Sequence, residues 1–258
     1  MVAPAGRSCL YWLVQYRRWW RVSLLISFVN PALYLAAMGL GLGGLIDRGG
    51  PAAALGGHGY LAFLAPGLLA ANAMQTAVGE STWPVGNAVR WTRSYVAMVA
   101  TPLRPGAVMA GHLLFAGLRA GLGAGAFLIV AGLFGALDSP MAVWAWPVAL
   151  LCALAHAAPA AAFSVGRSHD QANAALQRFV VIPLFLFSGV FFPVSQLPGV
   201  LRVVAYLTPL WHGVVLCREL CLGQAQFLSG VGHLGYLVLW LVAGCLLARG
   251  AYRRALTR

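Results

Sequence analysis

The sequence contains no lysine and few acidic residues. All 17 basic residues of the 258-residue chain are Arg, and Asp and Glu together number five. The phosphate-binding loop G-x-x-x-x-G-K-[ST] requires a Lys and is therefore excluded. If ATP drives this protein, another chain must bind the nucleotide and its magnesium ion.

The scarcity of acidic residues also argues against several enzyme and transporter classes. No paired carboxylates and no Ser/His/Asp set stand out, and we expect no acidic residue inside a membrane span, where ion-coupled transporters carry them. The five Cys form no C-x-x-C pair, and the six His lack the spacing of metal ligands. We therefore expect no catalytic residue, metal site or cofactor site in this chain.

Apolar residues dominate the composition. Hydrophobic residues make up 61% of the chain, charged residues 9%, and the mean hydropathy is +0.81. Globular domains carry roughly 25% charged residues. The sequence therefore predicts an all-α integral membrane protein with a single transmembrane domain over residues 1–258. The net charge of +12 could suit nucleic acid, but the Arg residues are dispersed around apolar runs, so membrane lipid is the expected partner.

The apolar runs predict six transmembrane helices, at 22–43, 60–78, 108–136, 142–165, 179–192 and 231–247. The fifth run covers about 21 Å of helix, which is short of the roughly 30 Å hydrocarbon core. Residues 193–222 follow it and are broken by Pro193, Pro198 and Pro209. Backbone at membrane depth needs protein partners. We therefore expect an outer re-entrant helical hairpin packed against other spans.

Residues 8–21 mix aromatic side chains with Arg17, Arg18 and Arg21 before the first long apolar run. Aromatic residues favour the headgroup region, and Arg favours anionic lipid. This pattern predicts an N-terminal amphipathic elbow helix at the membrane interface. The alternative is an irregular beginning of the first span.

The distribution of Arg predicts the orientation. If both termini are cytoplasmic, one side holds most of the Arg residues, namely Arg7, Arg17, Arg18, Arg21, Arg90, Arg93, Arg104, Arg167, Arg178, Arg249, Arg253, Arg254 and Arg258. The outer side then holds Arg48, Arg202 and Arg218. Positive residues concentrate on the cytoplasmic side of membrane proteins. We therefore expect a multi-pass protein of a bacterial plasma membrane, with an even number of spans.

The third predicted span carries three glycines and one Arg. Gly117, Gly121 and Gly125 share one helix face, on which another helix can approach closely. Arg119 lies about 200° around the helix from Gly117. Three interpretations of Arg119 stay open: snorkelling toward the inner headgroups, a polar contact within the bundle, or a place where an anionic cargo enters.

Several motifs resemble the type-2 ABC exporter permeases. They are Ser-Gly-Val-Phe-Phe-Pro at 188–193, Gln-Leu-Pro at 196–198 and Tyr-Leu-Thr-Pro-Leu at 206–210, followed by His212. Residues 65–69 and 100–103 also resemble this family, so the resemblance covers most of the chain. The branch is similar to the NodJ-like and daunorubicin-resistance permeases, which move lipo-oligosaccharides or amphipathic drugs. These proteins commonly have Asn at the position of Thr208.

The resemblance implies an exporter that moves a lipid-linked saccharide, a lipo-oligosaccharide or an amphipathic drug out of the cytoplasm or the inner leaflet. Two permease chains, identical or sister copies, would pair with two cytoplasmic ABC ATPases, and the cargo would pass at their interface. The resemblance also places an ATPase-coupling helix between the second and third spans, at 80–105. Aromatic and Arg side chains often anchor interfaces, so the candidate coupling residues are Glu80, Trp83, Arg90, Trp91, Arg93 and Tyr95. The alternative is a helix lying on the membrane surface.

Candidate cargo contacts are Arg119 and the aromatic residues expected near the outer leaflet, which are Phe185, Phe187, Phe191, Phe192, Tyr206 and Trp211. Aromatic faces suit both sugar rings and amphipathic drugs. The alternative is an aromatic belt that contacts only lipid.

Two alternative functions belong to other classes. A membrane-embedded transferase acting on lipid-linked sugars would be active without ATP. A membrane scaffold would show no ATPase-dependent transport.

Overall fold

The computed structural model describes residues 4–44, 57–167 and 170–257. Every regular element in these ranges is helical, and none is a strand. Five stretches are long and apolar enough to cross a membrane: Trp20–Gly39, Tyr60–Arg90, Pro105–Leu133, Pro140–Val165 and Phe227–Leu256. A sixth is obtained if the bent pair Gly199–Tyr206 and Pro209–Cys221 counts as one span. The predicted all-α membrane fold is therefore confirmed.

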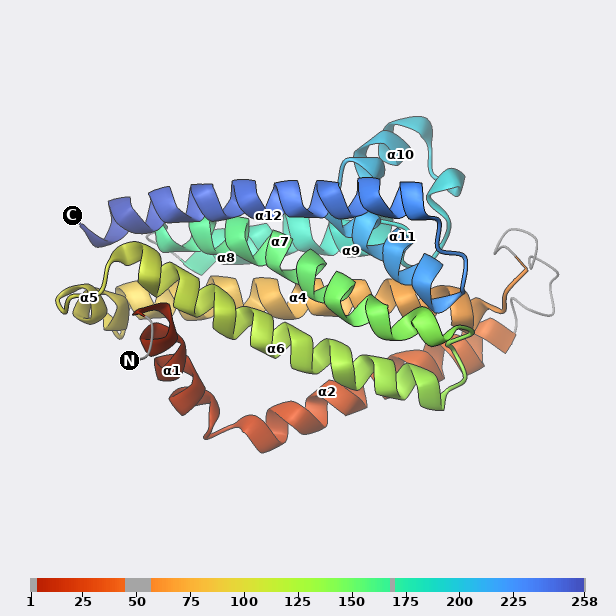
Figure 1. Ribbon diagram of the computed structural model, residues 1–258, viewed down its shortest axis with the longest axis horizontal. Helices are drawn as coiled ribbons and strands as arrows, with labels where there is room; N and C mark the ends of the chain where they lie inside the picture. The colour runs from red at the N-terminus through yellow and green to blue at the C-terminus, as the bar shows by residue number, and fades with distance from the viewer. Residues whose placement is uncertain (1–3, 45–56, 168–169, 258) are drawn as a thin grey trace.

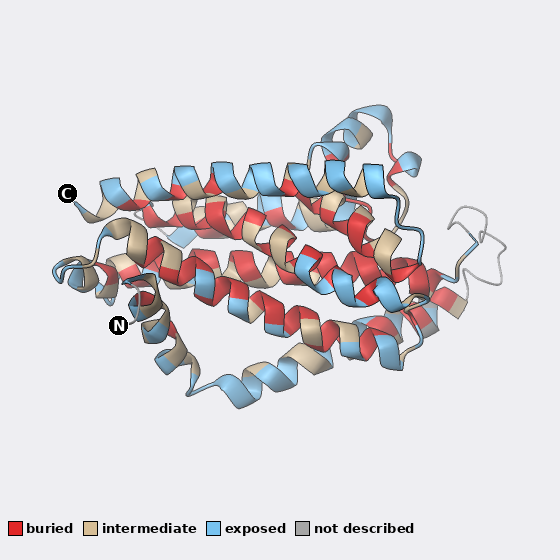
Figure 2. Cartoon of the chain, in the orientation of Figure 1, coloured by how far each residue is buried: buried red, intermediate tan, exposed pale blue. Residues whose placement is uncertain are grey.

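The long helices run side by side along the longest axis of the molecule (Figure 1). α4 (Tyr60–Arg90) is the most buried of the spans, and it packs on α6 (Pro105–Leu133), α7 (Ala145–Val165) and α11 (Pro209–Cys221). Alanine supplies much of the buried surface of α4 and α7, because small side chains let transmembrane helices approach closely. Figure 2 shows that α12 (Phe227–Leu256) instead presents a largely exposed face.

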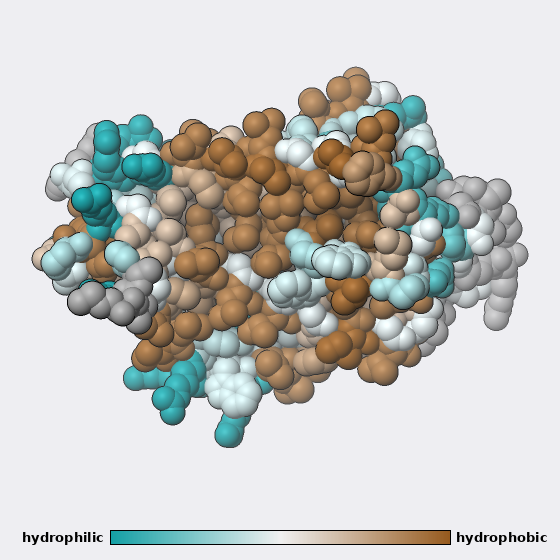
Figure 3. All heavy atoms as spheres, viewed as in Figure 1, coloured by the Kyte–Doolittle hydropathy of each residue, from teal (hydrophilic) through white to brown (hydrophobic). Residues whose placement is uncertain are grey.

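The two ends of the bundle differ from its middle. Figure 3 shows a broad apolar band with hydrophilic groups gathered toward the ends. α1 (Pro4–Tyr16), α5 (Ser94–Val99) and the C-terminus lie at one end, which we call the α5 end (Figure 1). α10 (Gly199–Tyr206) and the turn between α6 and η3 (Pro140–Trp144) lie at the opposite, α10 end.

The N-terminal helix differs slightly from the predicted range 8–21. α1 begins at Pro4 and ends at Tyr16, and residues 17–19 form the turn into α2 (Trp20–Tyr34). α1 is therefore a separate helix that meets α2 at a sharp angle (Figure 1).

α1 is seated on α6 by aromatic packing and by one glycine. The buried Trp12 lies 5.0 Å from the His112 ring and stacks on Phe115 at 5.7 Å, measured between ring centroids. A Cβ atom at Gly111 would lie 2.4 Å from the Ala5 carbonyl oxygen. Any larger residue at this position would therefore push α1 away from α6.

The second span was predicted to end at residue 78, but α4 continues to Arg90. Pro84 lies inside this helix and has no N–H group, so the Glu80 carbonyl lacks its helical donor. His112 of α6 lies across from this carbonyl, and its Nε2 donates to the oxygen at 3.0 Å. Because a neighbouring helix satisfies the carbonyl, the first part of the predicted coupling loop is helical.

The other helices overlap the predicted spans but differ at their ends. α2 runs into the π-helical η1 (Leu35–Gly43), and η3 precedes α7. α6 begins and ends three residues before the predicted 108–136, and α12 extends beyond both ends of the predicted 231–247. The fifth helix begins within the polar loop that was expected at 166–178. It comprises α8 (Asp170–Leu176), η4 (Gln177–Val181) and α9 (Ile182–Phe187). It ends at Phe187 rather than at Phe192, and it does not meet the length and hydropathy criteria of the five spans.

The predicted hairpin is present as η5 (Val194–Gln196), α10 and α11. α10 and α11 meet at an angle of 79°, and α10 stands away from the bundle in Figure 1. Thr208 caps α11: its hydroxyl accepts from the Trp211 N–H at 3.3 Å and donates to the Ala205 carbonyl at 2.7 Å. Asn and Thr are both good N-cap residues, so Thr208 can serve where related chains have Asn.

Arg218 holds the hairpin to the bundle. Its Nε donates to the Phe63 carbonyl at 3.1 Å, and its Nη2 donates to the Gly189 carbonyl at 2.9 Å. The guanidinium also lies 3.8 Å from the centroid of the Phe63 ring. Gly189 has φ +80, a left-handed conformation that favours glycine. Arg218 was counted among the Arg residues of the outer side, and its contacts show that it binds the backbone of the bundle there rather than standing free.

The orientation is the first testable prediction. In a variant without native cysteines, Gln196→Cys at the α10 end should react with an impermeant thiol reagent from outside intact cells. Thr257→Cys at the α5 end should react only after permeabilisation, because most Arg residues flank that end and favour the cytoplasm. External labelling of Thr257→Cys would contradict cytoplasmic termini. Arg48 and Arg258, which also entered the orientation argument, lie outside the described residues.

Candidate functional site between the elbow helix and the bundle

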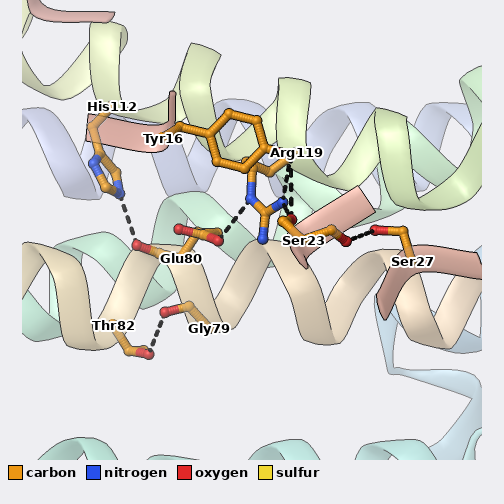
Figure 4. A network of polar contacts seen from close by, with 8 residues as sticks. All are labelled: Tyr16, Ser23, Ser27, Gly79, Glu80, Thr82, His112 and Arg119. Carbon is orange, nitrogen blue, oxygen red and sulfur yellow. Dashed lines mark hydrogen bonds and ion pairs between the residues drawn. The ribbon is translucent and has the colours of Figure 1, made fainter. Parts of the chain in front are cut away.

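Arg119, at the middle of α6, is the centre of a polar cluster (Figure 4). Its Nε donates to Glu80 Oε1 at 3.0 Å, and its Nη1 donates to the Tyr16 hydroxyl at 3.2 Å and to Ser23 Oγ. The guanidinium also lies 4.7 Å from the centroid of the Tyr16 ring. Tyr16 and Ser23 stand on either side of the turn between α1 and α2. The cluster therefore joins both of these helices to α4 and α6.

The Arg119–Glu80 pair is largely shielded from solvent, with side chains 18% and 20% exposed. A lone Arg at the centre of a span costs about 2.5–3.5 kcal/mol on insertion scales, and Glu80 supplies the missing countercharge. This geometry corresponds to a polar contact within the bundle, the second of the three interpretations. Glu80 lies two residues past the predicted end of the second span, within the continuous helix α4.

Three pockets adjoin along this side of the molecule. The Trp83 pocket, about 460 Å³, is lined by Trp12, Gln15, Trp83, Asn87, Trp91 and Asp170 among others. The Glu80 pocket, about 560 Å³, shares Trp12 and Gln15 with it and extends to Trp19, Ser23 and Arg119. The Asn72 pocket, about 300 Å³, shares Trp19, Ser23 and Arg119 and reaches Asn30, Asn72 and Thr76. The three pockets therefore follow one another from the α5 end toward the middle of α4, with shared side chains as the walls between them.

The six candidate coupling residues do not lie together. Glu80 pairs with Arg119, and Trp83 lies on α4 and lines the Trp83 pocket. Tyr95 is fully buried, and its ring packs 6.1 Å from Trp12 and 5.8 Å from Tyr252. Burial raises the pKa of the Tyr95 phenol well above its ordinary value. Tyr95 is therefore a core residue and is not available as an interface anchor.

The remaining coupling candidates surround the turn between α4 and α5. The Trp91 side chain is 75% exposed, and Arg93 is exposed and left-handed at φ 50. Arg90 pairs with Asp170 and donates to the Arg167 carbonyl at 2.9 Å. Arg90 thus links this turn to the other connection at the α5 end.

The three glycines of α6 face α7. A Cβ atom at Gly117 would lie 3.1 Å from Leu154 Cδ2, and one at Gly121 would lie 3.2 Å from the Trp146 ring. Trp146 Nε1 donates to the Gly121 carbonyl at 2.8 Å. A Cβ atom at Gly125 would lie 3.6 Å from Trp146 Nε1. The glycine face therefore receives large α7 side chains, and it also lines an apolar groove of about 910 Å³.

The predicted cargo aromatics gather around the hairpin and contact one another. Phe185 and Phe191 meet edge to face at 5.1 Å, and Tyr206 and Trp211 do so at 4.6 Å between ring centroids. Phe192 packs against the small hydrophobic cluster formed by Val194, Leu197 and Ala205, and Phe187 is 39% exposed. These contacts stabilise the hairpin, whether or not cargo also touches it.

Sequence reasoning missed the polar residues that line the three pockets away from Arg119. Gln15, Ser23, Asn30, Asn72 and Thr76 lie in apolar or interfacial segments. Polar side chains inside predicted spans were the available signal, because they are costly there and are often functional. Among the described residues, no group of three His, Cys, Asp or Glu residues could hold a metal ion.

The ion pair yields the second prediction. Arg119→Leu should lower thermal stability in detergent by about 3 kcal/mol, because Glu80 is left as an unpaired buried charge. Glu80→Leu combined with Arg119→Leu should restore most of that loss. The four chains of this double-mutant cycle are compared by the melting temperature of the purified protein. Equal stability of Arg119→Leu and the unaltered chain would contradict the pairing.

Comparison with known proteins agrees with this architecture. A family model described as "ABC-2 type transporter" matches residues 9–222. Nodulation protein J of Rhizobium leguminosarum bv. viciae is 30% identical over 262 residues, covering 99% of this chain and 98% of the relative. The protein of the same name from Rhizobium leguminosarum bv. trifolii is 31% identical, with 99% and 97% covered, and that of Rhizobium meliloti (strain 1021) is 29% identical, with 95% and 92% covered. The chain belongs to the ABC-2 type transporter family, as a multi-pass membrane permease similar to nodulation protein J.

Proposed function

We propose that this chain is the membrane subunit of an ATP-driven exporter of a lipid-linked saccharide, a lipo-oligosaccharide or an amphipathic drug. The observation that carries the proposal is the match to ABC-2 transporters over residues 9–222, in a chain that lacks the Lys of a phosphate-binding loop. ATP hydrolysis therefore belongs to a separate ABC ATPase. The permease transmits the conformational change to the cargo.

The ATPase docks at the turn between α4 and α5. Trp91 is the most exposed aromatic side chain of this turn, and Arg93 lies beside α5 with an exposed side chain. Aromatic and Arg side chains are enriched among the residues that dominate interface energies. Arg90 of the same turn pairs with Asp170. A partner docked at this turn therefore also affects the position of the helix that begins at Asp170.

A second permease copy or a sister chain completes the transporter. Exposed apolar side chains cover α2, where they include Leu25 and Ile26, and the α8–α9 helix, where they include Phe179 and Ile182. These faces can pack on lipid or on another permease. Their extent supports an assembly of two permeases at which the cargo crosses.

The third prediction tests ATPase docking. Trp91→Ala or Arg93→Glu should lower the affinity for the ATPase about thirtyfold, since losing an interface anchor costs about 2 kcal/mol. Co-purification of the tagged permease with its ATPase from membranes measures this loss. Trp144→Ala is the matched control, because Trp144 is also exposed but lies in η3 at the α10 end, and its loss should leave the ATPase bound.

Reconstituted vesicles test the transport function itself. Export of a fluorescent lipo-oligosaccharide should require the permease, the ATPase and ATP together. Modification of the lipid-linked sugar without ATP would instead support the transferase alternative. The absence of both sugar modification and transport in the presence of the ATPase and ATP would support the scaffold. Retained ATPase with normal export in both Trp91→Ala and Arg93→Glu would move the docking site to the connection before α8.

A further inference from the structure

The three adjoining pockets lie in a row beside the elbow helix, and we call this row the polar track. The Trp83 and Glu80 pockets share Trp12 and Gln15, and the Glu80 and Asn72 pockets share Ser23 and Arg119. Glu80 lies about 15 Å along α4 from Arg90, and Asn72 lies about 12 Å farther on, at 1.5 Å per residue. The track therefore runs from the α5 end to the depth of the membrane interior.

The deep part of the track carries polar side chains without protein partners. Asn30, Asn72 and Thr76 line the Asn72 pocket, and none of them has a hydrogen-bond partner among the described residues. Polar groups at membrane depth are costly unless something satisfies them. These side chains can both donate and accept, so they suit a ligand rich in hydroxyl groups.

The charged side chains differ between the two ends of the track. Arg18 lines the Glu80 pocket and has no acidic partner among the described residues, whereas Arg119 is the one charged side chain that lines the Asn72 pocket, and Glu80 holds it. An anionic headgroup would have to compete with Glu80 for the guanidinium and would meet no other Arg in the Asn72 pocket. The electrostatics of the Asn72 pocket therefore favour an uncharged headgroup over a phosphate at the deep end of the track.

Aromatic faces line the shallow part of the track. Trp83 is 45% exposed in the Trp83 pocket, and Trp19 is 67% exposed where the other two pockets meet. Indole faces pack on the apolar faces of sugar rings, while Gln15 and Asn87 supply amide groups beside them. Aromatic platforms next to uncharged polar groups are the chemistry that a saccharide requires.

We propose that this track binds the uncharged oligosaccharide headgroup of a lipid-linked cargo, which enters at Trp83 and advances past the elbow helix to Asn72. The lipid chain stays in the bilayer against the exposed apolar face of α2, at Leu25, Ile26 and Val29. This inference rests on the proposed export function and names its cargo site. It places the first cargo contacts within one permease chain, at the end opposite the hairpin aromatics.

Photolabelling of the purified permease in lipid nanodiscs tests the site. The probe is an alkyl cellotrioside with a diazirine on its terminal sugar, and the matched probe carries a diazirine-bearing phosphate headgroup on the same chain. The sugar probe should label α4 peptides that contain Asn72 and Trp83. Asn72→Leu should weaken labelling about fivefold, the equivalent of one hydrogen bond. Thr76→Val, which preserves shape, should act in the same direction.

Gln75→Leu is the matched control, since Gln75 lies on the same helix and lines none of the three pockets. Its labelling should equal that of the unaltered chain. Preferential labelling of the track by the phosphate probe, labelling confined to the hairpin, or equal labelling of Asn72→Leu and Gln75→Leu would each overturn the inference. The assay needs neither ATP nor the ATPase. If the sugar probe does not label the track but ATP-driven export persists, only this site is refuted. If the probe labels the track but no export is observed, only the transport function is refuted.

Discussion

The structure depends on one constraint: a polar group at membrane depth must find its partner inside the protein. Pro84 would leave the Glu80 carbonyl without a donor, and His112 of α6 supplies one. The interruption of the helix after α9 would likewise leave carbonyl groups without donors. Arg218 donates to the Gly189 carbonyl and to the Phe63 carbonyl. In both places a side chain from a distant helix completes a backbone that the local sequence leaves open. The helices are therefore held by specific polar contacts as well as by small-residue packing.

The same constraint explains why the Arg119–Glu80 pair affects the positions of four helices. The pair is shielded, so separating its partners would leave two poorly solvated charges. Because Tyr16 and Ser23 also bind Arg119, α1 and α2 cannot move far from α4 and α6 without disturbing the pair. The elbow helix is thus anchored to the bundle by the residue that divides the Glu80 pocket from the Asn72 pocket. A change in elbow position and a change in access between these pockets are therefore geometrically linked.

The sequence predicted those features that arise from local composition. Long apolar runs located the spans, and Pro193, Pro198 and Pro209 located the broken hairpin. The errors arose where tertiary contacts override local signals. The polar composition after residue 78 suggested a loop, yet α4 continues because His112 satisfies the carbonyl that Pro84 leaves open. Tyr95 resembled an exposed anchor but is buried against Trp12, a residue of α1. Neither contact has a signature within a sequence window, and the pairing of Glu80 with Arg119 has none either.

The contacts at the α5 end connect the proposed docking turn to the rest of the fold. Arg90 is the last residue of α4, and it binds Asp170, the first residue of α8, as well as the Arg167 carbonyl. The α4–α5 turn is therefore in direct contact with the beginning of the helix that runs from Asp170 to Phe187. That helix ends just before Gly189, whose carbonyl is held by Arg218 of α11. At the hairpin the same Arg218 also binds α4, through the Phe63 carbonyl. α4 and the α8–α9 helix are thus joined near both ends, by Arg90 at the α5 end and by Arg218 at the hairpin, while the Arg119–Glu80 pair joins α4 to α6, α1 and α2.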